Sequence, residues 1–104
     1  GVEDDAGLKT AAQRLRREYE NLSFKDDESM ENFALRLTSI IAQLDTLRDP
    51  KPAEKVVARY LLVARPRYKQ LVISIEILLD VSTLTIEEVT GRLKAAEEDD
   101  DPHP

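Results

Sequence analysis

The chain has 104 residues, enough for one domain with a single hydrophobic core. Hydrophobic residues make up 41% and charged residues 35%, a mixture typical of amphipathic helices that cover a modest core. The lack of cysteine excludes disulfides, zinc knuckles and thiol nucleophiles. The net charge of −6 argues against direct nucleic-acid binding, because proteins that neutralise phosphates usually carry the opposite imbalance.

Acidic runs occupy both ends of the chain, and we expect residues 1–5 and 99–104 to be disordered tails around one helical domain at 6–98. The only histidine, His103, falls in the second tail and is no candidate catalyst. The chain starts at Gly1 without methionine, which suggests an excerpt or a processed product. Apolar stretches are too short to span a membrane and no signal-peptide pattern is present, so we expect a cytoplasmic protein without a membrane partner.

The first half of the chain predicts two helices, over about 6–21 and 29–47. Their apolar stripes comprise Leu8, Ala11 or Ala12, Leu15, Tyr19 and Leu22, and then Met30, Phe33, Leu37, Ile40, Ile41, Leu44 and Leu47. Residues 26–29 offer several side-chain oxygens that could cap the second helix, and the pattern does not choose among them.

Prolines mark the predicted helix boundaries in the second half of the chain. Pro50 and Pro52 end the second helix and begin a third, which runs to about Arg65 before Pro66 interrupts it. Residues 67–79 fit both an alternating strand and a helical stripe, and helix is favoured because no second strand is available to pair with.

The last segment begins with a capping box and a hydrophobic staple. Thr85 can cap the Glu88 amide, Glu88 can reach back, and Leu84 can pack on Val89. A final helix then runs to about Glu98. The sequence therefore predicts an all-α fold, a compact bundle of about five helices around one core.

Catalytic chemistry is not expected. The acidic clusters lie at predicted helix starts, where capping explains them, and the sequence contains no metal-ligand spacing or glycine-rich phosphate loop. We therefore expect a protein that is not an enzyme and that needs no metal or cofactor.

Between Leu15 and Glu98 the order of motifs resembles the gag polyprotein of copia-type LTR retrotransposons and of gag-derived domesticated genes. The motifs that carry the resemblance are Leu15-x3-Tyr19, Glu28-Ser29-Met30-x2-Phe33-x2-Arg36-Leu37, Glu54-Lys55-Val56-Val57, Pro66-x-Tyr68 and Leu84-Thr85-Ile86-Glu87-Glu88-Val89-x3-Leu93. The resemblance implies a fold like the retroviral capsid C-terminal domain and a role in building virus-like particles.

Glu28, Phe33 and Arg36 also keep the spacing of the major homology region of retroviral capsids, a segment that orders the C-terminal domain. The resemblance implies that Glu28 and Arg36 bond to each other. Eight residues exceed two helical turns, so Glu28 must fold back from the helix start to do so. Two independent, solvated charges are the alternative.

The third helix is apolar almost all round, so it either lies centrally or offers a face to a partner. By resemblance to the retroviral two-fold contact, we expect a homodimer or lattice contact through Val56, Tyr60 and Val63. A domesticated adaptor that binds a heterologous peptide in a helical groove is one alternative. An RNA-binding module that uses Lys9, Arg14, Arg16 and Arg17 is another, less favoured one, because those residues fit a solvated helix face.

Overall fold

The computed structural model describes residues 2–99, and these residues form helices and no strand. The elements in chain order are α1 (Val2–Glu20), α2 (Met30–Thr46), α3 (Ala53–Leu78), the 3-10 turn η1 (Val81–Thr83) and α4 (Ile86–Asp99). The predicted all-α class is therefore confirmed, and residues 67–78 are helical rather than a strand. No helix within residues 2–99 combines the length and apolar character needed to cross a membrane.

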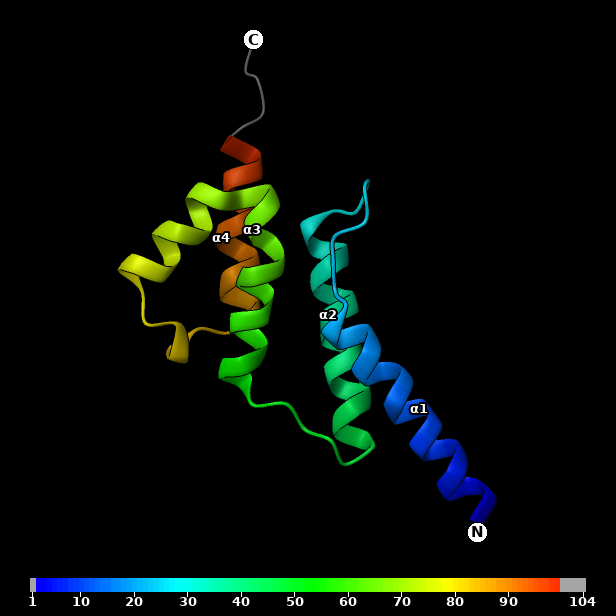
Figure 1. Cartoon of the computed structure of the whole chain (residues 1–104). Coiled ribbons are helices and arrows are strands. Elements are labelled where there is room, and N and C mark those ends of the chain that lie inside the picture. Colours follow the sequence, from blue (N-terminus) through cyan, green and yellow to red (C-terminus); the bar gives the residue numbers. More distant parts are fainter. Residues whose placement is uncertain (1, 100–104) are drawn as a thin grey trace.

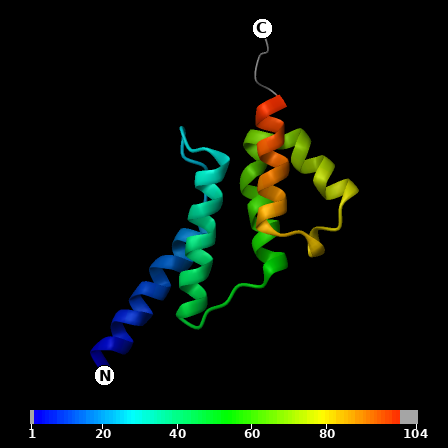
Figure 2. The same ribbon diagram turned by 180° about the vertical axis from the view of Figure 1, so that it is seen from behind.

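α2, α3 and α4 lie side by side, while α1 crosses α2 obliquely and its first half extends beyond the other helices (Figure 1). The view from behind shows the same arrangement, with α4 against α3 and the start of α1 far from both (Figure 2). This projection contributes to an elongated shape, with extents of 61 × 30 × 18 Å.

One apolar core joins all four helices. The largest side chains that are fully buried belong to Tyr60, Phe33, Met30, Leu37, Leu44 and Leu93. Tyr60 of α3 meets Phe33 of α2 with ring centroids 5.4 Å apart, and Leu93 of α4 is completely buried in the same cluster. Burying such side chains is the main term that stabilises a domain of this size.

α1 begins at Val2, so the expectation of a disordered tail is wrong for residues 2–5. Acidic side chains are favourable in the first turn of a helix because they face the positive end of its dipole. The acidic run that was taken for a tail is thus compatible with a helix start. Gly1 and residues 100–104, including His103 and most of the second predicted tail, lie outside the described residues.

α2 begins at Ser29, which settles the choice left open among residues 26–29. The Ser29 hydroxyl accepts a hydrogen bond of 3.1 Å from the backbone N–H of Asn32. The helix ends in a Schellman motif, in which the Asp49 N–H donates to Leu44 O at 2.8 Å and the Arg48 N–H donates to Asp45 O at 3.1 Å.

Arg48 occupies the left-handed position of that motif, with φ of 64°. A side chain there costs about 1 kcal/mol relative to glycine, because its Cβ crowds the backbone. We expect Arg48→Gly to raise the free energy of unfolding by about 0.5–1 kcal/mol, measured by urea denaturation. Arg48→Ala removes the same charge and keeps the Cβ, so it should give no such gain; an equal gain in both variants would contradict the explanation.

α3 continues through Pro66 and changes direction at Tyr68, whose φ of −130° and ψ of 44° are not helical. Proline removes the hydrogen bond to the carbonyl four residues earlier, which weakens the helix locally. α3 thus consists of two helical stretches that meet at a kink close to the boundary predicted at Pro66. Because they form one continuous element, residues 2–99 contain four α-helices where about five were expected.

α4 begins with half of the predicted capping box: the Thr85 hydroxyl caps the Glu88 amide, while the Glu88 carboxylate accepts from the Thr85 hydroxyl instead of from its backbone N–H. The Glu88 N–H donates to Thr85 Oγ1 at 3.1 Å, and the Thr85 hydroxyl lies 3.1 Å from the Glu88 carboxylate. Leu84 and Val89 are both buried in the core cluster, as the hydrophobic staple requires. The family-motif residues Leu84 and Glu88 therefore define the entry into α4.

Candidate functional site

The segment before α2 is a tight turn held by the Glu28–Arg36 ion pair. Arg36 Nε donates to Glu28 Oε2 at 3.0 Å, and Arg36 Nη2 donates to Glu28 Oε1 at 2.8 Å. Arg36 Nη2 also donates to Ser23 O at 2.7 Å, and the Lys25 N–H donates to Glu28 Oε1 at 3.1 Å. The bond expected between Glu28 and Arg36 is present, and the alternative of two independent charges is excluded.

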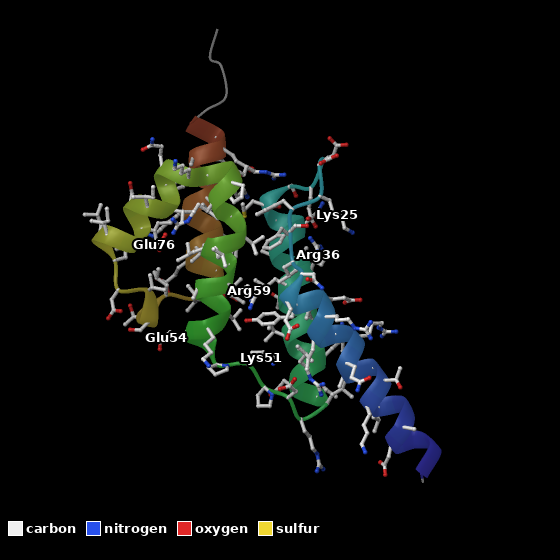
Figure 3. The ribbon with its side chains drawn as sticks, in the orientation of Figure 1. Lys25, Arg36, Lys51, Glu54, Arg59 and Glu76 are labelled. Carbon is white, nitrogen blue, oxygen red and sulfur yellow. The ribbon has the colours of Figure 1, made fainter. Side chains whose placement is uncertain are left out.

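The ion pair is only partly accessible to solvent. The Glu28 side chain is 8% exposed and the Arg36 side chain 29% exposed. The hydrogen bond from Arg36 lowers the pKa of Glu28 below its ordinary value of 4.5, against the opposing effect of burial. Figure 3 shows Lys25 and Arg36 at the same end of α2, where the turn meets the helix. The carboxylate is therefore held ionised by a fork of two hydrogen bonds.

A second arginine, Arg67 of α3, holds the same turn from the other side. Its Nη1 donates to Glu28 O at 2.7 Å and its Nη2 donates to Lys25 O at 3.3 Å. Sequence reasoning missed this residue, which stands between the two motif residues Pro66 and Tyr68. Its isolated charge gave no indication of a contact almost forty residues away in the chain.

Two stacked rings lie beneath these arginines. Phe24 and Phe33 have centroids 4.1 Å apart and an interplanar angle of 24°. The guanidinium carbon of Arg67 lies 4.4 Å from the Phe24 centroid, and that of Arg36 lies 5.3 Å from the Phe33 centroid. These cation–π contacts join the turn to the core at Phe33.

Pro66 and Tyr68 mark the bend of α3 close to this turn. Pro66 is exposed, and the half-buried Tyr68 lies edge-on to Phe24 with centroids 6.4 Å apart. The Tyr68 hydroxyl donates to the Glu97 carboxylate of α4. Burial and this carboxylate raise the pKa of Tyr68 to about 12. The bend therefore connects α3 to the turn and to the end of α4.

The proposed interface residues on α3 require a correction. Val56 is 2% exposed and Tyr60 is 0% exposed, so neither side chain is available to a second copy; Val63 is half-buried against the core. α4 and η1 pack along α3, and the Tyr60 ring meets Phe33 of α2, so Val56 and Tyr60 face the core of the domain. Of the two alternatives for an all-round apolar helix, the central position holds for Val56 and Tyr60.

The Tyr60 hydroxyl is satisfied within the chain. The Thr90 hydroxyl donates to Ile86 O at 2.7 Å, so the Tyr60 hydroxyl donates its single proton to Thr90 Oγ1 at 2.8 Å, and Met30 Sδ lies 2.9 Å away. Burial raises the pKa of Tyr60 to about 12. This tyrosine is a core residue whose hydroxyl stays protonated at neutral pH.

Exposed apolar side chains occur elsewhere. The large ones are Leu8, Leu35, Leu62, Ile77 and Leu78. Leu62 borders a shallow hollow of about 440 Å³ between α1 and α3. Lys51 and Arg59 lie over the face of the Tyr19 ring in this hollow. Arg59 points from α3 toward α1 and donates to Glu20 O at 3.2 Å (Figure 3). A second hollow, of about 390 Å³, lies between α1 and the last turn of α2.

No cluster within residues 2–99 brings together three or more side chains able to hold a metal ion. The acidic residues with shifted pKa values are explained by ion pairs, as for Glu28 with Arg36 and Asp49 with Arg16. No known protein family, curated protein or solved structure matches the chain.

Proposed function

We propose that this chain is a structural interaction module of a retrotransposon gag capsid, which self-associates as part of a virus-like particle. The observation that carries the proposal is the turn at residues 23–28, where Glu28 and Arg36 form the bond that the resemblance to the major homology region implies. The all-helical fold around Phe33 supports the same proposal. A cytoplasmic location and the absence of catalysis belong to this proposal.

The hydrogen bonds of the turn support a structural role. Arg36 and Arg67 satisfy three backbone carbonyls there, those of Ser23, Lys25 and Glu28, and thereby fix the entry into α2. Groups used in this way are occupied by the fold and are not free to bind a substrate. What remains for function is surface, and a module with modest apolar patches suits repeated weak contacts whose avidity stabilises a lattice.

We expect reversible self-association in the micromolar range, because a shell built from many copies needs only weak pairwise contacts. Sedimentation velocity over a concentration series from about 1 to 500 μM should show the weight-average mass rising from monomer toward dimer or larger species. Electron microscopy of the same samples would test for particles. A constant monomer mass over the whole series would overturn the proposal.

An adaptor function is the second candidate, and the hollow beside Leu62 favours it. Leu62 is 62% exposed, and Lys51, Lys55 and Arg59 also line the hollow. This combination suits a peptide that carries an apolar side chain between carboxylates. Two results together would favour the adaptor: the chain remains monomeric, and it binds a labelled peptide that contains leucine between glutamates. The Leu62→Asp variant should then lose this peptide binding.

A further inference from the structure

The apolar stripe of α1 runs past the end of the helix that covers it. Ala12, Leu15 and Tyr19 are 4–6% exposed, because the rest of the domain packs on them. Leu8 lies on the same face, one helical turn closer to the N-terminus, and it is 52% exposed. The stripe therefore continues onto the part of α1 that projects from the domain (Figure 1).

A hollow lies directly beside this exposed leucine. Its volume is about 390 Å³, and it is lined by Ala11, Arg14 and Leu15 of α1, by Ala42, Gln43 and Thr46 of α2, and by Leu47 just after α2. Ala11 is three residues from Leu8, or about 4.5 Å along the helix axis. α1 thus carries an exposed apolar side chain and, one turn further along the helix, a recess whose lining is partly apolar and partly polar.

We propose that a second copy of this chain docks on this face, with the two α1 helices antiparallel and a two-fold axis passing near residues 9 and 10. Leu8 of each copy then lies opposite Ala11 of its partner, at the edge of the partner's hollow. A patch that contains both the protrusion and the recess is self-complementary, which is the requirement for an isologous contact. This inference rests on the proposed self-association and names its surface.

The charges of α1 favour the antiparallel arrangement. The sequence has an acidic run at residues 3–5 and a basic stretch at residues 14–17. Arg14 and Arg17 are exposed, as is Asp5. With the axis near residues 9 and 10, Asp5 of one copy lies level with Arg14 of the other at both ends of the contact. A parallel pair would instead place like charges side by side.

The first test is Leu8→Asp, measured by sedimentation velocity against the wild type. Leu8 is exposed, so the variant should fold normally, and the dissociation constant should rise about 10- to 100-fold because the leucine no longer finds apolar cover. Leu35→Asp is the matched control: Leu35 is 68% exposed on α2 and should leave self-association unchanged. If the wild type dimerises and the Leu8→Asp chain dimerises equally well, this surface is wrong but the proposed self-association stands. A wild type that stays monomeric overturns the proposed function as well.

The second test exchanges charges between copies. Asp5→Lys places basic side chains at both ends of the contact and Arg14→Glu places acidic ones there, so each substituted chain should self-associate more weakly than the wild type. Mixing the two variants at low salt should restore dimers as a heterodimer, since opposite charges now meet at both ends. Mixtures no more associated than the separate variants would overturn the antiparallel contact.

Discussion

Replacing Phe33 by alanine is expected to lower the free energy of unfolding by about 3–5 kcal/mol. The Phe33 ring is fully buried, stacks on Phe24 at 4.1 Å and meets Tyr60 at 5.4 Å, so its removal leaves a cavity between α2, α3 and the turn before α2. Urea denaturation followed by circular dichroism measures the change. A small domain has about 5–15 kcal/mol in total, so the variant should be close to unfolding at ambient temperature.

Leu35→Ala provides the control for that prediction. Leu35 lies on α2 two residues from Phe33 but is 68% exposed, so the same kind of truncation should change the free energy of unfolding by less than about 0.5 kcal/mol. Similar losses in the two variants would mean that helix propensity, rather than burial, sets the cost. A loss below about 1 kcal/mol for Phe33→Ala would contradict the assigned core.

Replacing Glu28 by glutamine is the second large change. It removes the charge that pairs with Arg36 through hydrogen bonds of 3.0 and 2.8 Å and leaves the partly buried guanidinium without its carboxylate. At pH 7 we expect a loss of about 2–3 kcal/mol of stability. Asp26→Asn, an exposed carboxylate in the same turn, should cost less than about 0.5 kcal/mol.

The loss on Glu28→Gln should depend on pH. Because Arg36 lowers the pKa of Glu28 in the folded chain, the ionised carboxylate stabilises the fold above the ordinary value of 4.5. This contribution falls as the pH drops through the lowered pKa, since the carboxylate then becomes protonated in the folded state as well. The difference in stability between wild type and variant should therefore be full at neutral pH, begin to shrink near pH 4.5 and vanish only below the lowered pKa of Glu28. A difference that stays constant down to strongly acidic pH would exclude the ion pair as its source.

The helices were predictable because their stripes repeat along the chain. The stripe from Met30 to Leu44 needs only the 3.6-residue period, and the capping box at Thr85 and Glu88 is a local arrangement. The predictions differ from the structure where one local sequence pattern is compatible with two structures. The acidic residues before Ala6 fitted a tail as well as a helix start, and Pro66 fitted a break as well as a kink.

The candidate site was predictable only in part. The spacing of Glu28 and Arg36 led to a correct contact through the resemblance, whereas Arg67, which binds the same turn, had no counterpart in that spacing. Val56 and Tyr60 were chosen because their helix has more apolar residues than one face requires. The structure buries both, since α3 has neighbours on more than one side.

The sequence by itself determined that this chain is helical, where most of its helices begin and end, and which residues of each helix share an apolar face. Only the tertiary structure decided which of those faces is covered: Tyr60 lies in the core, while Leu8 on α1 is half exposed. The physical reason is that periodicity depends on neighbours three and four residues away. Burial instead depends on which distant helix packs there and on how far that helix extends.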